Sequence, residues 1–304
     1  MTAVDRGPAP AAAPTGPSTR IVPGERARFR ARRRLAVGLK YASLLVAAVV
    51  VLLPLLVVLF TSLKTSSEAL TTSPLRPPAD WGNLGNFALA FHDGRMFQGF
   101  ANTAFILAFS VTGTVLIGSM TAYALDRFHF RGRGVVLGGF LLAALVPSVT
   151  TQVTTFQVVN FFGLYNTRWS AIVLYVGTDI VSIYIFLQMI RSIPTALDEA
   201  ARIDGAGPWS VYWRIILPNL KPAVATVVIV KGITVYNDFY IPFLYMPDKD
   251  LGTISTSLFR FKGPFGASWE AISAGTILVI VPTLVVFLAL QRYIYNGFAA
   301  GAVK

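Results

Sequence analysis

The sequence predicts an all-α integral membrane protein with six transmembrane helices. Of its 304 residues, 54% are hydrophobic and only 13% are charged, and the mean hydropathy is +0.62. This composition is typical of membrane proteins, and it excludes a disordered chain, which has too little apolar surface to condense. A soluble nucleic-acid-binding protein could share the net charge of +12 but rarely this apolar content, so we expect no nucleic-acid partner.

Six apolar stretches carry the fold prediction, because a helix needs about 20 apolar residues to cross the hydrocarbon core. The first is free of charged residues, and the fourth and fifth each contain a single one, Asp179 and Lys231. Pro282 predicts a kink in the last stretch. The third runs into a more polar stretch, so it could extend beyond residue 149. The predicted spans are residues 41–63, 103–125, 135–149 or longer, 171–190, 223–241 and 271–290.

Residues 1–34 are predicted to be a disordered, basic, Pro- and Ala-rich tail, and residues 35–304 to form the six-span domain. Repeated prolines oppose helix formation in the tail, and no apolar core follows its first charges as in a signal peptide. Its basic residues cluster between Arg26 and Lys40, directly before the first span. That position favours contact with anionic membrane lipid over nucleic acid.

Loop charge predicts the orientation. Of the 26 Lys and Arg residues, 18 lie in the tail and in loops 126–134, 191–222 and 291–304, and 7 lie in the loops on the other side. Because cytoplasmic segments carry the excess of cations, both termini are predicted to be cytoplasmic.

The two charges inside the spans are predicted to lie close together. A charged side chain at the bilayer centre costs about 2.5–3.5 kcal/mol on insertion scales. Asp179 and Lys231 lie near the middle of antiparallel neighbouring spans, at similar depth. We expect them to pair across the helix interface or to face a shared aqueous cavity. A contact in a transport path and a structural ion pair are both compatible with this placement.

The loop between the fourth and fifth spans reads as two short helices with a glycine-containing break. Thr195 is placed to cap the first helix. Asp198 and Arg202, spaced i,i+4, are expected to pair on its surface. Pro208 is expected to start the second helix and Pro218 to end it.

This loop, residues 191–222, resembles the EAA loop of ABC importer permeases. The pattern runs Glu199-Ala200-Ala201, three residues, Gly205, nine residues, Ile215, one residue, Leu217-Pro218. On it the chain is similar to the maltose-permease-like subunits of binding-protein-dependent carbohydrate importers. The resemblance implies the type I ABC importer permease fold, with a coupling helix that docks on a cytoplasmic ATPase. The implied coupling residues are Asp198, Glu199, Ala200, Ala201, Asp204, Gly205, Ile215, Leu217 and Pro218.

Further segments extend the resemblance from about residue 40 to the end. They are Thr61-Ser62-Leu63-Lys64, Gly163-Leu164-Tyr165-Asn166-Thr167, Asp204-Gly205-Ala206, Tyr236-Asn237-Asp238-Phe239 with Tyr where the family has Trp, and the tail from Gln291. The C-terminal tail is the segment that favours sugars over amino acids or peptides.

The resemblance implies a di- or oligosaccharide importer in the bacterial cytoplasmic membrane. The implied partners are a second permease subunit in a heterodimer, two ATPase subunits, an extracellular solute-binding protein and membrane lipid. No Gly-Lys dipeptide occurs, so the chain lacks a P-loop; it is expected not to be an enzyme and to leave ATP and Mg²⁺ to the ATPase. With two histidines and no cysteine, no metal site and no cofactor are expected in this chain.

A sugar path needs polar groups and aromatic faces. We expect Phe156 and Phe239 to form apolar walls; the alternative for each of these residues is helix packing or an interfacial aromatic belt. The polar residues predicted for the path are Gln157, Asn160, Asp179, Lys231, Tyr236, Asn237 and Asp238.

Three other functions compete. An ion-coupled secondary transporter would use Asp179 and Lys231 as coupling groups. An importer of the same family could carry glycerol phosphate, a polyol or another non-sugar solute. A polytopic membrane enzyme would need a catalytic motif, and the sequence offers none. The EAA-like loop favours the ABC importer.

Overall fold

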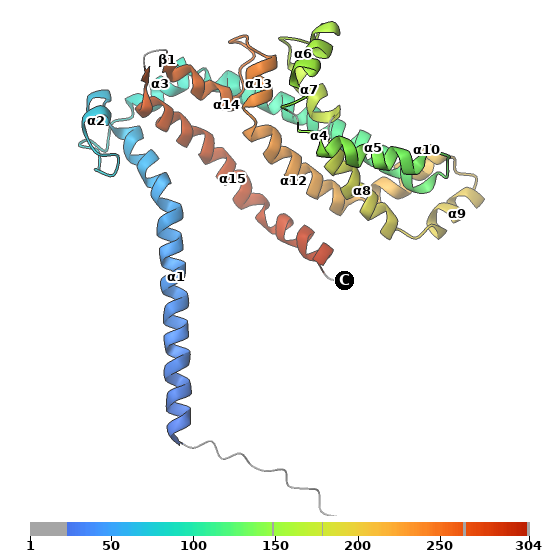
Figure 1. The fold of residues 1–304 in the computed structure, drawn as a ribbon, viewed down its shortest axis with the longest axis horizontal. Helices are drawn as coiled ribbons and strands as arrows, with labels where there is room; N and C mark the ends of the chain where they lie inside the picture. Colours follow the sequence, from blue (N-terminus) through green and yellow to red (C-terminus); the bar gives the residue numbers. More distant parts are fainter. Residues whose placement is uncertain (1–22, 148, 178, 264–265, 303–304) are drawn as a thin grey trace, which may run out of the picture. The chain divides into compact units, whose positions relative to one another are not determined.

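The computed structural model describes residues 23–147, 149–177, 179–263 and 266–302. The chain divides into two compact units, residues 1–56 and 57–304 (Figure 1). Helix α1 (Pro23–Leu63) forms the described part of the first unit and ends in the second. Within the described residues, all regular structure except one short hairpin is helical.

Helix α1 begins at Pro23, earlier than the sequence predicted. Residues 23–34, expected to belong to a disordered tail, are helical; residues 1–22 lie outside the described part. Proline suits the first helical position because its missing N–H has no partner there, and the Ala and Arg residues that follow favour helix. Along the apolar half of α1, side chains such as Leu45 and Val51 are 67% and 69% exposed. Such a helix needs lipid or protein around it.

Helix α4 (Met96–Arg127) is the centre of the second unit, packed against α7 (Arg168–Gly177), α8 (Ile180–Ser192) and α12 (Lys221–Asn237). Its buried face carries small and polar residues, which let neighbouring helices approach closely. Gly113 is an example, since a Cβ there would lie 2.8 Å from Val176 Cγ2. Helix α15 (Trp269–Ala302) packs against α12 and α3 (Gly85–Asp93).

The described helices give three apolar spans, or five when bent pairs are counted as one each. The three are residues 34–63 of α1, α4, and residues 269–289 of α15. The bent pairs are α7 with α8, at 44°, and the helical segment 208–219 with α12, at 73°.

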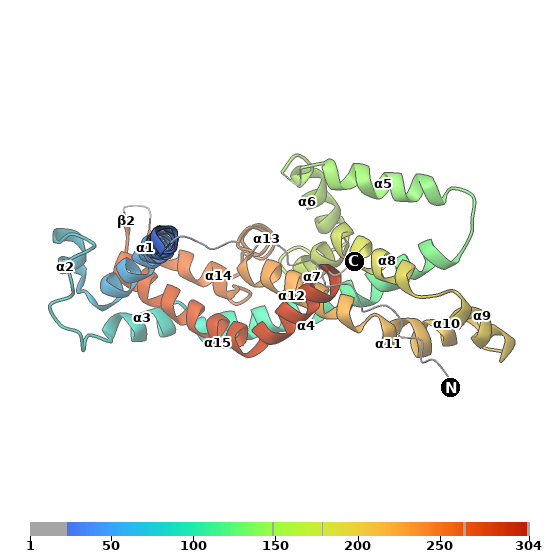
Figure 2. The ribbon, with the colours of Figure 1, turned by 90° about the horizontal axis from the view of Figure 1, so that it is seen from below.

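The third predicted span, residues 135–149, is shorter in the structure. Helix α5 (Arg133–Leu145) has 13 residues, about 20 Å of helix against a hydrocarbon core of about 30 Å. Pro147 is the cause, because the residue before a proline avoids the helical conformation and Val146 is extended. Helix α6 (Gln152–Phe161) follows after a turn, and α5 runs beside α8 (Figure 2).

Short elements connect the ends of the long helices opposite the loop 191–222. They are α2 (Ser66–Thr71), α13 (Tyr240–Tyr245), α14 (Ile254–Ser257), the 3₁₀ helix η2 (Leu258–Phe261) and the antiparallel hairpin of β1 (Lys262–Gly263) and β2 (Gly266–Ala267). Lys64, only 1% exposed, donates to Thr72 Oγ1 at 3.1 Å and to the Ser73 carbonyl at 2.8 Å, which fixes the turn after α1.

The packing of α4 against α14 predicts an asymmetric response to glycine substitution. A Cβ at Gly99 would lie 2.6 Å from Ser257 Oγ and 3.3 Å from the Ile254 backbone, so Gly99→Ala should cost about 1–3 kcal/mol of stability. Gly138→Ala, on α5 with nothing within 4 Å, should be neutral or stabilising by up to about 1 kcal/mol. Thermal denaturation in detergent, followed by tryptophan fluorescence, measures the stability of both variants. If Gly138→Ala were the more destabilising of the two, the close packing of α4 against α14 would be contradicted.

Candidate functional site

The loop 191–222 folds as a helix, a tight turn and a second, irregular helix. Helix α9 (Ala196–Ile203) begins at the predicted cap position, Thr195, whose side chain makes no capping hydrogen bond. The second helix comprises α10 (Pro208–Val211), the π-helical turn η1 (Tyr212–Ile216) and α11 (Leu217–Asn219).

The sequence predicted that Pro218 ends this second helix. In the structure Pro218 lies inside the helix. Proline has no N–H for the carbonyl four residues earlier, so a regular α-helix is interrupted at this point. The chain makes a π turn here, in which the Leu217 N–H donates to the Tyr212 carbonyl five residues back. The helix therefore continues through Asn219 before the chain turns into α12.

Gly205 makes the break between the two helices possible. Its φ of +82° lies in the left-handed region, where a side chain costs roughly 1–2 kcal/mol. The Ala206 N–H donates to the Ala201 carbonyl and the Gly205 N–H to the Arg202 carbonyl, which is the Schellman arrangement for a helix end. Gly207, the second glycine between the two helices, has a φ of −72° that other residues adopt.

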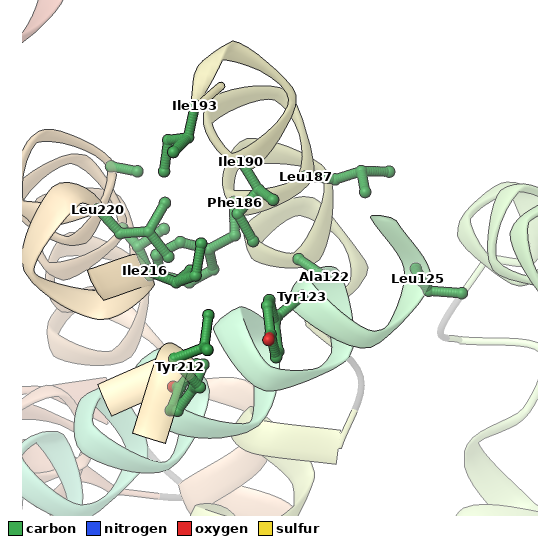
Figure 3. Close-up of a cluster of buried hydrophobic side chains, with 13 residues drawn as sticks. Ala122, Tyr123, Leu125, Phe186, Leu187, Ile190, Ile193, Tyr212, Ile216 and Leu220 are labelled. Atoms are coloured by element: carbon green, nitrogen blue, oxygen red, sulfur yellow. The ribbon is translucent and has the colours of Figure 1, made fainter. Parts of the chain in front are cut away.

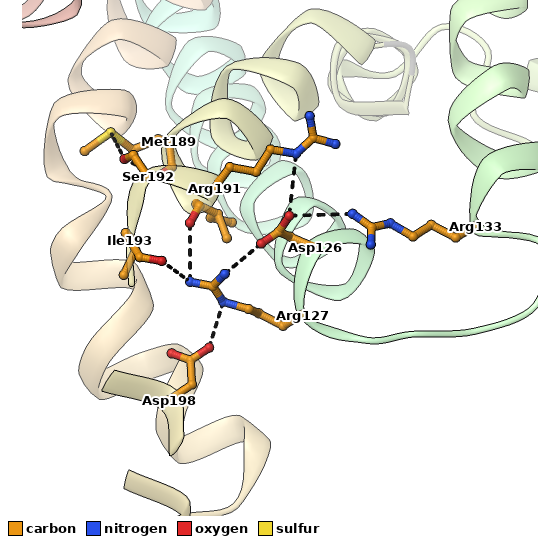
Figure 4. A network of polar contacts seen from close by, with 9 residues as sticks. Asp126, Arg127, Arg133, Met189, Arg191, Ser192, Ile193 and Asp198 are labelled. Carbon is orange, nitrogen blue, oxygen red and sulfur yellow. Dashed lines mark hydrogen bonds and ion pairs between the residues drawn. The ribbon is translucent and has the colours of Figure 1, made fainter. Parts of the chain in front are cut away.

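Arg127, at the end of α4, holds α9 in place (Figure 4). Its Nε lies 2.7 Å from Asp198 Oδ2, and its Nη2 donates to the Ile193 carbonyl at 2.7 Å and the Ile190 carbonyl at 3.3 Å. The side chains of Arg127 and Asp198 are only 6% and 4% exposed. The predicted surface pair of Asp198 with Arg202 is therefore wrong: Asp198 points inward from α9 and meets Arg127.

Asp126 extends this network to two further helices. Its Oδ2 accepts from Arg127 Nη1 at 2.8 Å, and its Oδ1 lies 3.6 Å from Arg133 Nη2 on α5 and 3.5 Å from Arg191 Nε on α8 (Figure 4). One end of α4 is thus tied by charge to α5, α8 and α9.

An apolar core lies under the same loop (Figure 3). Tyr212, 1% exposed, packs its ring 5.6 Å from that of Tyr123, and its hydroxyl lies 2.8 Å from Ser119 Oγ. Burial raises the pKa of the Tyr212 phenol, so the hydroxyl stays neutral. Phe186, Ile216 and Leu220 complete the contact between α8 and the second helix of the loop.

The residues implied in coupling divide between the two faces of the loop. Asp198 is buried, and Ala201, Ile215 and Leu217 are half-buried against the core. The outward face is exposed, and it includes two large apolar side chains, Ile203 at 86% and Trp209 at 65%. The exposed residues of the predicted set are Glu199, Ala200, Asp204, Gly205 and Pro218. Exposed apolar side chains beside charges are typical of a docking surface.

The second cluster lies at the break between α7 and α8. Asp179 Oδ2 lies 3.0 Å from Lys231 Nζ, with the side chains 11% and 10% exposed. Asp179 also caps α8, accepting from the Ser182 N–H at 3.2 Å and the Ser182 hydroxyl at 2.9 Å. The structure therefore pairs the two intramembrane charges directly.

Lys231 also supplies a hydrogen-bond donor where the helix is broken. Because α7 ends at Gly177, the Tyr175 carbonyl lacks its regular helical partner, and an unpaired carbonyl in hydrocarbon is costly. Lys231 Nζ donates to this carbonyl. The Tyr175 hydroxyl donates to Asp238 Oδ2 at 2.9 Å, and Asp238 Oδ1 accepts from the Tyr240 N–H at 2.7 Å, so the network reaches the start of α13.

The other predicted path residues lie apart from this cluster. The Tyr236 hydroxyl donates to the Val279 carbonyl of α15 at 3.0 Å, and Asn237 Nδ2 donates to the Ile233 carbonyl of its own helix at 3.0 Å. Gln157 and Asn160 are exposed on α6. Sequence reasoning missed Tyr175, although its spacing of four residues from Asp179 places both on one side of a helix.

In the part of the chain that the structure describes, no group of three or more His, Asp or Glu residues is placed to hold a metal ion.

The family model of the binding-protein-dependent transport system inner membrane component matches residues 114–299, which include both clusters and the loop. The chain belongs to this family. It is therefore a multi-pass integral membrane component of such a transport system, and the resemblance seen in the EAA-like loop is confirmed.

Two curated relatives of this family member illustrate the similarity. The galactooligosaccharides transport system permease protein GanQ of Bacillus subtilis (strain 168) is 30% identical, covering 91% of this chain and 99% of that protein. The diacetylchitobiose uptake system permease protein NgcG of Streptomyces coelicolor is 31% identical and covers 92% of each.

A solved structure supports the fold. A chain of a bacterial ABC transporter involved in the import of the acidic polysaccharide alginate aligns with a TM-score of 0.74 and 20% identity. The alignment covers 86% of this chain and 98% of that one. The family member thus has the type I ABC importer permease fold.

Removal of the buried arginine should be strongly destabilising. Arg127→Met leaves Asp198 buried without its partner, which costs about 3–5 kcal/mol. The double variant Arg127→Met/Asp198→Leu should recover part of this loss, because no unpaired charge remains. Denaturation midpoints of the purified protein measure both, with Arg131→Met, an exposed arginine just after α4, as the matched control. If Arg127→Met were as stable as Arg131→Met, the Arg127–Asp198 pair would not be what holds α9 in place.

The intramembrane pair predicts a similar rescue. Lys231→Met leaves the Asp179 carboxylate unpaired within the spans, at a cost of about 2.5–3.5 kcal/mol. Adding Asp179→Asn removes that charge and keeps an acceptor for Ser182, so the double variant should yield more folded, monodisperse protein than Lys231→Met alone. Equal yields would show that the unpaired carboxylate is not the dominant cost.

Proposed function

We propose that the chain is one of two permease subunits in an ATP-driven, binding-protein-dependent importer of a di- or oligosaccharide. The names of its relatives support this substrate class: galactooligosaccharides, melibiose, raffinose and stachyose, and diacetylchitobiose. The chain covers almost the whole length of GanQ and NgcG, so the comparison concerns whole subunits.

The importer would contain this chain, a second permease subunit, two cytoplasmic ATPase subunits and an extracellular solute-binding protein. ATP and Mg²⁺ would bind to the ATPase subunits. A related structure, an alginate ABC transporter, is in complex with a periplasmic protein, which is consistent with such an assembly. The membrane would be the bacterial cytoplasmic membrane, with both termini on the cytoplasmic side.

The six-span arrangement remains part of this proposal. Residues 34–63 of α1, α4, the bent pair of α7 and α8, α12, and α15 would supply five crossings, with residues 208–219 at the cytoplasmic end of α12. Helix α5 with the chain that follows it would supply the third crossing in sequence. The cation-rich loops then all lie on the side of the EAA-like loop.

The main support for the proposal is that the loop has a fixed inner face and an exposed outer face. Its inner face is fixed by the Arg127–Asp198 pair and the core around Tyr212, and its outer face presents Glu199, Ala200 and Ile203. A helix held in this way moves as a rigid body with α4 and α8. Closure of an ATPase bound to the outer face would therefore be transmitted directly to the spans.

The intramembrane cluster would border the solute path. Asp179, Lys231 and Asp238 are joined by short polar contacts where α7 and α8 break and α12 ends. Tyr236, Asn237, Gln157 and Asn160 are proposed as further path residues, with uptake specificity in point variants as their test. An ion-coupled transporter is the competing function, and uptake that persists without the ATPase would favour it over the ATP-driven importer.

A charge reversal at Glu199 tests the coupling role. Glu199→Lys places a cation on the exposed face of α9 without touching its buried anchors, so the protein should insert and fold normally. We expect uptake of a labelled oligosaccharide by proteoliposomes, and ATP hydrolysis stimulated by the binding protein, to fall at least tenfold.

Asp93→Lys is the matched control, since Asp93 is an exposed carboxylate at the opposite end of the helices. It should leave both activities unchanged. Normal uptake and hydrolysis by the Glu199→Lys importer would overturn the coupling assignment.

A further inference from the structure

A cavity of about 270 Å³ lies at the start of α7, lined by Phe105, Leu251 and residues 166–169. It contains a cation without a counter-charge. Arg168 is half-buried and its Nε is buried with no hydrogen-bond partner, and no ion pair of Arg168 is found among the described residues. Its guanidinium instead lies 5.3 Å from the centroid of the Phe105 ring. An arginine in this state has N–H groups to offer a ligand.

The position of Arg168 along its helix sets its depth in the membrane. Arg168 precedes Asp179, which lies near the middle of its span, by 11 residues. Helix α7, which begins at Arg168 and ends at Gly177, is about 15 Å long at a rise of 1.5 Å per residue, close to half of the roughly 30 Å hydrocarbon core. Arg168 therefore lies where hydrocarbon meets headgroups, at the interface opposite the EAA-like loop.

Three aromatic rings pack against one another beside Arg168, with Phe109 one helical turn further along α4 than Phe105. The Phe109 and Trp169 rings are 5.5 Å apart, and Phe105 lies 4.6 Å from Phe109. Phe109 and Trp169 are 45% and 47% exposed. Tryptophan is enriched at the membrane–water interface, where its ring contacts acyl chains and its N–H faces headgroups.

We infer that this cavity binds the headgroup of an anionic phospholipid, with the phosphate on Arg168 and the upper acyl chain on Phe109 and Trp169. A guanidinium and a phosphate form paired, charge-assisted hydrogen bonds. The nearby outer loop carries both signs: Asp248, whose N–H donates to Asn166 Oδ1, Lys249, and Asp250, which is paired with Arg95. Arg168 is thus left as the cation facing the cavity.

A solute or a protein partner is a weaker match for the same surface. Phe109 lies one helical turn beyond Phe105 along α4, toward the middle of that span, so its exposed ring and that of Trp169 are placed to meet an acyl chain and not a hydrated sugar. The inference rests on α7 and α8 forming a membrane span, and it does not depend on which solute is imported.

Tryptophan quenching by brominated lipid tests the site directly. The assembled importer is reconstituted in nanodiscs with increasing mole fractions of brominated phosphatidylglycerol or brominated phosphatidylcholine. The Trp169 signal is the difference between the native importer and the Trp169→Phe importer. Phosphatidylglycerol should half-quench this signal at about a fivefold lower mole fraction, as expected for one cation near a lipid surface.

Variants at Arg168 separate a specific site from general lipid contact. Arg168→Leu should abolish the preference for phosphatidylglycerol, Arg168→Lys should keep part of it, and the exposed outer arginine variant Arg76→Leu should leave it unchanged. Equal quenching by both lipids in the native importer would overturn the inference, as would an unchanged preference in Arg168→Leu. Absence of quenching by either lipid would also overturn it, and would show that a protein subunit covers this face. The comparison of lipids in the native importer decides the question even if Arg168→Leu does not assemble.

Discussion

A buried guanidinium must be surrounded by acceptors, and in this protein that requirement organises the whole end of the helix bundle near the EAA-like loop. Arg127 collects two carboxylates and two backbone carbonyls from α4, α8 and α9. No single helix could supply these partners, so the arginine is satisfied only when the helices meet in one arrangement. The charge network therefore selects one position of the loop, and the apolar core around Tyr212 packs it there.

The second network obeys the same rule in reverse, because here unpaired acceptors require a donor. A helix broken inside a membrane exposes carbonyls that lipid cannot satisfy. Lys231 fills this need at Tyr175, and Asp179 then compensates the lysine while it caps α8. The break, the charge pair and the cap are thus one structural unit. An intramembrane charge here is a condition of the broken helix, whether or not a solute contacts it.

The features that could be predicted from the sequence depend on the length of an apolar stretch or on local backbone chemistry. Helices α4 and α15 follow from their apolar runs, and the turn at Gly205 follows from its need for a positive φ. The prediction failed where distant residues compete with local ones. The i,i+4 rule assigned Asp198 to Arg202 because it treats a helix as isolated, whereas Arg127, far away in sequence, offers a buried site. Pro147 ends α5 early. Pro218 is accommodated inside a helix by a π turn, and amino-acid composition does not indicate such a turn.

That π turn has a consequence for how the loop can evolve. It places one more residue in a turn than an α-helix would, and this sets the rotational phase between Val211, which faces the core, and the chain entering α12. Side chains on the outer surface can be exchanged without altering this phase. A gain or loss of a single residue between Gly205 and Pro218 would turn Tyr212 or Ile216 away from the core. Selection should therefore conserve the number of residues in this segment more strictly than their identity.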